Sequence, residues 1–349
     1  MTSTSPASWP VGVALRPPVD LEAATVELAD QVTGRRFQCR PEALAATILS
    51  GRVPAPLDQL GDRTALVPGL RHWLRRGWRP SDGAYLASRR WSYADTADPG
   101  NRIREQTVAG YLAAGGQPPA EQLPDGPVTV LGPPAPPGEQ PVTQLLNRRR
   151  TGRVYRSEPV PLADFSGLLW YGFARVRYRR ERSDPGMPLS LLDSVGSAWD
   201  IALAVYGVDG VEPGIYRYDI LRHELRLVQA GDHRAAMVDV LQGMHSPETA
   251  GWTLGLVADF PRYQWRYRHE HGLRRLWMEA GMIGQELLLL ASSYGISTLV
   301  TPAQKDRPFL RLHGFDDRRY AAVYTLTQGL SRGRAGVGIN GHDIEQVPR

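Results

Sequence analysis

A proline-dense stretch just past the first third of the chain limits, more than any other feature, what this sequence can fold into. Gly115–Gly116–Gln117–Pro118–Pro119 is followed by Gly132–Pro133–Pro134–Ala135–Pro136–Pro137–Gly138. Proline at this density removes backbone donors and holds the chain extended. We therefore predict an N-terminal module over residues 1–118, a semi-rigid linker over 119–140 and a larger domain over 141–349.

The composition is sufficient for two folded parts and does not indicate a nucleic-acid partner. The 349 residues are 42% hydrophobic and 22% charged, which is ordinary for a globular protein. The net charge of +5 is carried by arginine, which suits bidentate binding of phosphate or carboxylate and equally suits a solvated surface. No helix-turn-helix, zinc-finger or RNP pattern accompanies this charge, so we expect no nucleic-acid partner.

The cysteine count and the lengths of the apolar runs indicate the cellular compartment that we expect for this protein. Cys39 is the only cysteine, which excludes an intrachain disulfide and any multi-thiolate or iron–sulfur site. Met1 to Pro10 lacks the pattern of a secretory signal. The longest apolar runs, such as Leu287–Ala291, are far shorter than the roughly 20 residues of a membrane helix. We expect a cytoplasmic protein without a membrane partner.

Beyond the prolines, helical and strand-like patterns are intermixed. Gly295 suits a left-handed stop for the longest helical run. Because no steady βα repeat is present, the pattern predicts an α+β fold rather than a doubly wound sheet. The predicted helices cover Val142–Arg149, Leu162–Trp170, Leu273–Tyr294 and the region around Phe309–Leu312, and the predicted strands cover Ile201–Tyr206, Trp252–Ala258, Ile296–Val300 and Tyr320–Thr327.

The sharpest local feature is the run Arg148–Arg149–Arg150–Thr151–Gly152–Arg153. Four arginines and a hydroxyl group at the end of a helical run can bind a phosphate dianion through charge-assisted hydrogen bonds. The same residues also suit a solvated helix C-terminus that complements the helix dipole. The run alone leaves both readings open.

Further motifs follow in order and at consistent spacing. With Arg149–Arg153 they resemble the nitroreductase-like azoline oxidases, called SagB-type or McbC-like dehydrogenases, with Thr151 in place of a serine. The resemblance covers about residues 140 to 330 and implies a flavin domain with an antiparallel-rich central sheet, flanking helices and a long central helix. The motifs are Leu168–Gly172, Asp193–Trp199, Gly210–Tyr218 (the strongest), Glu279–Gln285, Gly314–Asp316 and Tyr320–Gly329.

This resemblance implies FMN as the cofactor and a homodimer with FMN at its interface. The protein would supply binding, orientation and electrostatics, and the flavin would supply the two-electron chemistry. The implied cofactor-binding residues are Arg149, Arg150, Thr151 and Arg153 for the phosphate and ribityl chain, Ser194, Val195 and Gly196 for the ring, Gln285 for an amide near the flavin from the partner subunit, and Arg332, with Arg334, as further phosphate ligands.

The chain departs from the family pattern at the expected base. The family uses a Lys-Tyr pair upstream of the central helix, where this chain reads Trp265–Arg266–Tyr267–Arg268. Arginine stays protonated and is a poor base. We therefore predict Tyr267 as the proton-transfer residue, assisted electrostatically by Arg266, with Tyr263 as the alternative. Asp193 replaces a usual proline and Met282 a common histidine.

Three further groups of residues give weaker predictions of function. His269 and His271 point to nearly opposite sides of a helix, so we expect no metal. The GxGxxG letters at Gly336–Gly341 stand too close to the chain end for a dinucleotide site. Trp199, beside the flavin motif, is a core anchor by default and a pocket-lining candidate otherwise.

The resemblance implies FMN-dependent oxidation of a thiazoline or oxazoline to a thiazole or oxazole, on a ribosomal or carrier-bound peptide. The N-terminal part resembles the small winged-helix-like recognition modules that precede such oxidases, and a cyclodehydratase is an expected partner. One alternative is a flavin-free scaffold that binds a peptide or partner enzyme. Another is an NAD(P)H-dependent nitro- or quinone reductase.

Overall fold

The computed structural model describes residues 13–16, 25–30, 32–33, 35–50, 102–116, 118–182, 198–268 and 271–332. The chain divides into two compact units, Met1–Gly100 and Asn101–Arg349. Predictions that concern Asp193, Ser194, Val195, Gly196, His269, Arg334 and Gly336–Gly341 lie outside the described residues.

The described residues of the first unit form a small antiparallel sheet followed by a helix. Strands β1 (Val13–Arg16), β2 (Val26–Asp30) and β3 (Arg36–Cys39) pair in chain order, and α1 (Pro41–Leu49) follows. Their small core contains Val13, Leu28 and Leu44. The winged-helix-like character of this unit stays a prediction.

The second unit is built on a seven-stranded sheet of order β4-β7-β6-β5-β8-β10-β9, in which each pair of neighbouring strands is antiparallel. Its central strands, β5 and β8, are buried along their whole length. The strands are β4 (Val128–Val130), β5 (Trp199–Val205), β6 (Gly214–Asp219), β7 (Glu224–Ala230), β8 (Trp252–Asp259), β9 (Ile296–Thr301) and β10 (Tyr320–Leu330).

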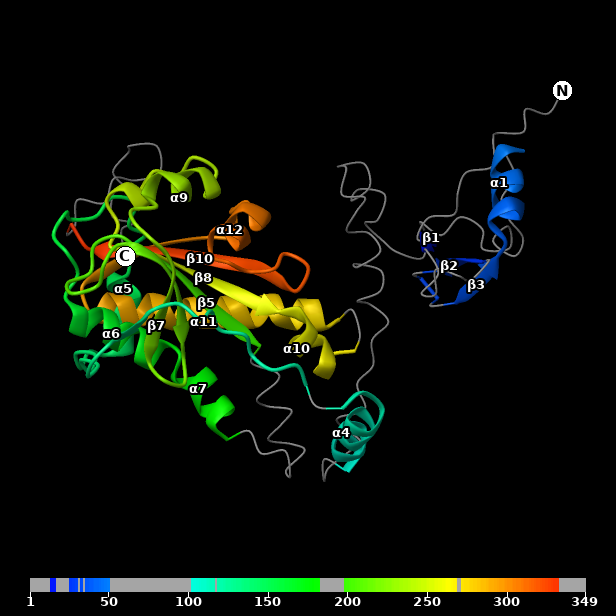
Figure 1. Cartoon of the computed structure of the whole chain (residues 1–349), viewed down its shortest axis with the longest axis horizontal. Coiled ribbons are helices and arrows are strands. Elements are labelled where there is room, and N and C mark those ends of the chain that lie inside the picture. Colours follow the sequence, from blue (N-terminus) through cyan, green and yellow to red (C-terminus); the bar gives the residue numbers. More distant parts are fainter. Residues whose placement is uncertain are drawn as a thin grey trace. The chain divides into compact units, whose positions relative to one another are not determined.

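Helices cover both faces of this sheet, with α6, α7 and α11 on one side and α9 and α12 on the other (Figure 1). Along β5, Ile201 and Leu203 belong to the first core, whereas Ala202 belongs to the second, as the alternation of a strand requires. The helices are α4 (Arg102–Gly115), α5 (Val142–Arg148), α6 (Leu162–Gly172), α7 (Ala174–Glu181), α9 (Arg234–Val240), α10 (Phe260–Arg266), α11 (Gly272–Ser293) and α12 (Asp306–Leu312).

Helix α11 crosses the sheet and carries two different faces. Its buried stripe, which includes Leu276, Ile283 and Leu287, faces the core. Gly284 makes close packing possible, because a Cβ there would lie 2.8 Å from the ring of Tyr324. The helix ends where Gly295 adopts a φ of +69°, which confirms the predicted stop.

The proline-rich segment differs from the linker that we expected. The division between units falls after Gly100, and residues 118–140 pack on the second unit. Strand β4 pairs with β7, Leu131 is fully buried, and the Tyr294 hydroxyl donates to the carbonyl of Ala135. Proline removes donors but leaves carbonyl acceptors, so an extended proline-rich segment can still pack along a sheet edge.

The α+β class, the antiparallel-rich sheet and the long central helix are confirmed. The second half of the Gly210–Tyr218 motif forms strand β6. Helix α7 was not predicted, because its sequence, ARVRYRRE, is mostly polar. Three of its residues are nevertheless buried. Within the described part, no helix has the length and apolar character needed to cross a bilayer.

Candidate active site

The arginine run leads into a loop that lies between the first residues of β9 and the last residues of β10. Thr151 forms a parallel bridge with Thr298, and the Gly152 amide donates to the Thr298 carbonyl over 3.3 Å. The Arg156 amide donates to the Leu330 carbonyl over 3.0 Å. The loop that carries the arginines is therefore fixed at one end of the sheet.

Tyr155 anchors this loop. Its side chain is fully buried, and its hydroxyl lies 2.7 Å from the carbonyl oxygen of Thr327. Burial raises the pKa of this phenol. Gly329 makes room for the ring, because a Cβ there would lie 2.8 Å from it. Arg332 donates its Nε to the Tyr155 carbonyl over 3.0 Å, so Arg332 joins the arginine run although nearly 180 residues separate them in sequence.

Within the described part of the chain, carboxylates do not neutralise the positive charge at this end. Among the described residues, no ion pair joins Arg149, Arg150, Arg153 or Arg332 to an acidic side chain. Arg150 donates instead to the carbonyls of Asn147 and Arg149. Arg150, Arg153 and Arg332 are exposed, and Arg149 and Thr151 are half-buried. A phosphate dianion is the ligand that such an array of guanidinium groups favours.

Arg266 and Tyr267 lie together at the end of α10. The ring of Tyr267 lies against that of Tyr263, with centroids 4.6 Å apart and planes tilted by 35°. The guanidinium carbon of Arg266 lies 4.9 Å from the Tyr267 ring centroid, and that of Arg275 lies 5.5 Å from it. Two cations therefore flank this phenol. Tyr263 donates its hydroxyl to the Gly272 carbonyl over 2.8 Å, and burial raises the pKa of its phenol.

These two groups lie at opposite ends of α11. Tyr267 precedes the first turn of the helix, whereas the arginine loop is bonded to β9, which starts directly after the helix. A helix of 22 residues is about 33 Å long at about 1.5 Å per residue. FMN joins its ring and phosphate through one ribityl chain and is far shorter. Within one chain, Arg153 and Tyr267 do not meet around one flavin.

Gln285 lies in the second half of α11 on the solvent face. The same face exposes large apolar side chains in the first half of the helix. Trp277 and Met278 are each 62% exposed and Met282 is 51% exposed, with Leu273 beside them. A run of exposed apolar side chains of this size marks an interaction surface.

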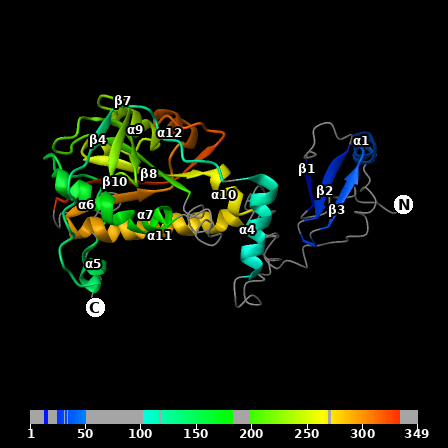
Figure 2. The same ribbon diagram turned by 60° about the horizontal axis from the view of Figure 1, so that its bottom comes forward.

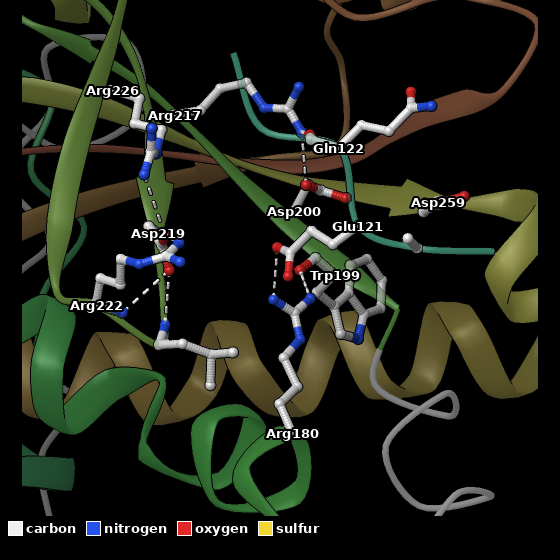
Figure 3. A network of polar contacts seen from close by, with 12 residues as sticks. Glu121, Gln122, Arg180, Trp199, Asp200, Arg217, Asp219, Arg222, Arg226 and Asp259 are labelled. Atoms are coloured by element: carbon white, nitrogen blue, oxygen red, sulfur yellow. Dashed lines mark hydrogen bonds and ion pairs between the residues drawn. The ribbon is translucent and has the colours of Figure 1, made fainter. Parts of the chain in front are cut away.

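The structure also reveals a buried ionic network that sequence reasoning missed (Figure 3). Arg217 donates to the carboxylate of Asp200 over 2.7 Å, and Arg180 contacts Glu121 over 2.7 Å. Burial raises the pKa of Asp200, while the Arg217 guanidinium opposes that rise. These charges come from segments that are distant in sequence, so no local motif signals them. Trp199 is fully buried in the main core, which supports its reading as a core anchor.

A second buried network links Ser166, His223 and Tyr218. The two imidazole nitrogens of His223 lie 2.8 Å from the hydroxyl groups of Ser166 and Tyr218. Burial lowers the pKa of His223 to about 4, helped by the nearby Arg177 guanidinium. Ser166 is fully buried, so this network is structural and not a nucleophile relay. Among the described residues, no group of His, Cys, Asp or Glu side chains is arranged to hold a metal.

Comparisons with known sequences agree with this arrangement. The profile of the Nitroreductase family matches residues 146–329. The trifolitoxin operon protein TfxC of Rhizobium leguminosarum bv. trifolii is 28% identical over 299 residues, which cover 79% of this chain and 81% of TfxC. The protein MJ1384 of Methanocaldococcus jannaschii is 30% identical over 166 residues, which cover 46% of this chain and 78% of that protein.

A solved structure shows a similar fold. A nitroreductase-like protein from Anabaena variabilis superposes with a TM-score of 0.50 and 21% identity over 63% of this chain, which spans only 44% of that longer protein. A chain of the E. coli microcin synthetase McbBCD complex with truncated pro-MccB17 bound superposes with a TM-score of 0.43 and 15% identity, covering 69% of this chain and 98% of that chain. The family profile runs over more than half of the sequence, from the arginine run to the end of β10, so this protein belongs to the nitroreductase family, whose members commonly bind flavin.

Proposed function

We propose that this protein is an FMN-dependent dehydrogenase that oxidises thiazoline or oxazoline rings to thiazoles or oxazoles in a ribosomal or carrier-bound peptide. The observation that carries the proposal is a group of arginines, Arg149, Arg150, Arg153 and Arg332, around the loop anchored by Tyr155, which have no acidic partner among the residues that the structure describes. This group fits the phosphate of FMN, with Thr151 as a hydroxyl donor. Bound FMN would supply two-electron oxidation.

The chain's own contribution to the reaction is a proton acceptor at the other end of α11. Removing the ring Cα proton needs a group within hydrogen-bond reach of that carbon. Tyr267 is our choice, because the guanidinium carbons of Arg266 and Arg275 lie 4.9 Å and 5.5 Å from its ring centroid, where they can assist proton transfer electrostatically. Tyr263 suits the role less, because its hydroxyl is engaged with Gly272 and its pKa is raised by burial.

The distance between the two ends argues for a homodimer. A two-fold pair that packs α11 against α11 in antiparallel fashion brings Tyr267 of one copy near the arginine loop of the other. The apolar side chains on the outer face of α11, Trp277, Met278 and Met282, are what such a pair would bury. In this arrangement, Gln285 lies at the interface, in the half of α11 that ends at its own arginine loop.

The substrate class rests on the resemblance of the site motifs to the azoline oxidases. TfxC, named for the trifolitoxin operon, matches both units of this chain. We expect a peptide or carrier-protein-bound substrate and a cyclodehydratase partner. Surface arginines would attract an acidic leader segment or carrier.

The experiment is a flavin-binding titration followed by turnover. Purified protein is titrated with FMN, and its absorbance between about 300 and 550 nm is recorded after desalting. We expect a retained flavin band, and we expect Arg153→Ala to weaken FMN binding about 10- to 100-fold, as the loss of a charge-assisted hydrogen bond predicts. The matched control is Arg307→Ala, since Arg307 is an exposed arginine paired with Asp317.

Turnover separates the remaining functions. The FMN-loaded protein is incubated with a synthetic thiazoline peptide in air, and the loss of two hydrogen atoms is followed by mass spectrometry. A protein that cannot hold FMN would instead be a binding scaffold. A protein that consumes NADPH without the peptide, and leaves the thiazoline intact, would be a nitro- or quinone reductase.

A further inference from the structure

Helix α4 packs on α10, the helix that ends beside Tyr267 (Figure 2). Val108 of α4 is fully buried, and it forms with Tyr111, Leu112 and Trp265 a cluster separate from the two cores of the sheet. The rings of Tyr111 and Trp265 meet edge to face, with centroids 5.9 Å apart at 79°. Trp265 therefore owes its burial to a helix that precedes the family match at residue 146.

Polar contacts close the same junction. Trp265 donates its indole NH to the carbonyl of Gly116 over 3.2 Å. The guanidinium carbon of Arg268 lies 3.8 Å from the centroid of the Tyr111 ring, and its Nε donates to the Trp265 carbonyl. Trp265 and Arg268 flank Arg266–Tyr267 in the sequence. Helix α4 thus contacts the chain on both sides of the pair that we propose for proton transfer.

The segment after α4 is fixed to the sheet by arginines. Arg319 donates to the Ala120 carbonyl over 2.9 Å and also pairs with the buried Asp259. Arg180 contacts Glu121, and Arg217 donates to the Gln122 carbonyl (Figure 3). Because these contacts hold residues 120–122, the C-terminal end of α4 has a fixed position relative to α10.

Helix α10 needs such support. It has only seven residues, and a helix this short has no stability of its own in water, so its orientation depends on what packs against it. Its buried residues are Arg262, Tyr263 and Trp265. Trp265 is the one that α4 covers, and it stands two positions before Tyr267.

We propose that Tyr111 and Trp265 are positioning residues for Tyr267, so that α4 forms a required part of the reaction centre. The inference rests on the proposed function, in which Tyr267 carries the proton. The Tyr111 ring contacts both the Trp265 ring and the Arg268 guanidinium, and these two contacts fix the position of the C-terminal end of α10. A small displacement of a catalytic group costs up to about 100-fold in rate.

The test uses the full-length, FMN-loaded protein and the synthetic thiazoline peptide. We expect Tyr111→Ala to lower kcat about 10-fold or more, with the FMN dissociation constant unchanged and KM within about two-fold. Tyr111→Phe keeps the ring and should restore kcat. The matched control is Tyr178→Ala, because Tyr178 is 58% exposed on α7 and its ring lies 5.0 Å from the Arg182 guanidinium.

A milder variant guards against misfolding. Trp265→Phe keeps an aromatic ring but loses the bond to Gly116, and we expect it to lower kcat a few-fold. Amide hydrogen exchange supplies a readout besides activity. Tyr111→Ala should speed exchange in residues 260–268 and leave α12 unchanged.

A double-mutant cycle decides between positioning and a general loss of structure. If Tyr111 acts through Tyr267, adding Tyr111→Ala to Tyr267→Phe produces no further loss of kcat. If the loss of kcat in the double variant equals the product of the two single losses, the inference is wrong. If Tyr267→Phe lowers kcat and Tyr111→Ala does not, the positioning role is wrong while the proposed function stands. If Tyr267→Phe itself leaves kcat unchanged, the proton carrier and the inference fall together.

Discussion

The phenol rings of Tyr263, in α10, and of Tyr267, the residue directly after this helix, have centroids 4.6 Å apart and planes tilted by 35°. Tyr263 is 2% exposed and donates its hydroxyl to the Gly272 carbonyl. The guanidinium carbons of Arg266 and Arg275 lie 4.9 Å and 5.5 Å from the centroid of the Tyr267 ring. Two neighbouring phenols thus have different environments: the Tyr263 hydroxyl is bonded to a backbone carbonyl, and two guanidinium groups lie near the Tyr267 ring.

This difference predicts opposite results for two conservative variants. Tyr267→Phe should lower kcat for thiazoline oxidation about 100-fold or more, the usual effect of removing a general base. Tyr263→Phe should keep kcat within a few-fold, although it loses one buried hydrogen bond worth about 1 kcal/mol of stability. Steady-state kinetics with FMN-saturated protein make the measurement. A larger loss in Tyr263→Phe than in Tyr267→Phe would reverse the assignment.

Mixed dimers test whether two copies share each site. Arg153→Ala and Tyr267→Phe chains are each expected to be nearly inactive at limiting FMN. If the arginine loop of one copy serves the tyrosine of the other, a mixed dimer has one intact site and one doubly altered site. Unfolding and refolding the two variants together should then restore about a quarter of wild-type activity, since about half of the dimers are mixed. Sites built within one chain would show no recovery.

The exposed face of α11 predicts the interface itself. Met278→Glu places a charge where an apolar face would be covered, so the dimer should dissociate at micromolar concentration. Leu221→Glu is the matched control, because Leu221 is 45% exposed but lies in the turn between β6 and β7. Light scattering after size-exclusion chromatography gives the mass. A dimer that survives Met278→Glu would place the interface elsewhere.

Two buried histidines predict acid sensitivity. Burial lowers the pKa of His313 and of His223 to about 4, compared with 6.5 in the unfolded chain. The unfolded state therefore binds more protons between these values, so stability is full above about pH 6.5 and falls as the pH drops toward about 4. For His313, which is fully buried, the loss between about pH 8 and pH 5 is about 2 kcal/mol.

Urea denaturation at a series of pH values measures this loss. A His223→Gln, His313→Gln variant should be less stable at about pH 8, because it loses the stacking of His313 on Phe309 and the contacts of His223. Its stability should change less between pH 8 and pH 5 than that of the wild type. If the free energy of unfolding changes equally with pH in the two proteins, these histidines are not the cause of the acid sensitivity.

Much of the fold could be predicted from local sequence. The long apolar periodicity predicted α11 and its stop at Gly295, because helix periodicity and a left-handed glycine are local properties. Strands β5, β8, β9 and β10 followed from short apolar runs. The arginine run was visible for the same reason. By contrast, α7 and α10 lack an apolar period and depend on tertiary contacts for their stability.

Which of these elements contact one another was decided only by the tertiary structure. It brings Arg332 to the arginine loop through the carbonyl of Tyr155, because antiparallel pairing returns the end of β10 beside the start of β9. It separates that loop from Tyr267 by the length of α11. It also turns an expected linker into an edge strand and a support for α10, since carbonyl groups accept hydrogen bonds from distant arginines whatever the local sequence. Contacts between distant segments depend on chain topology, which no local pattern encodes.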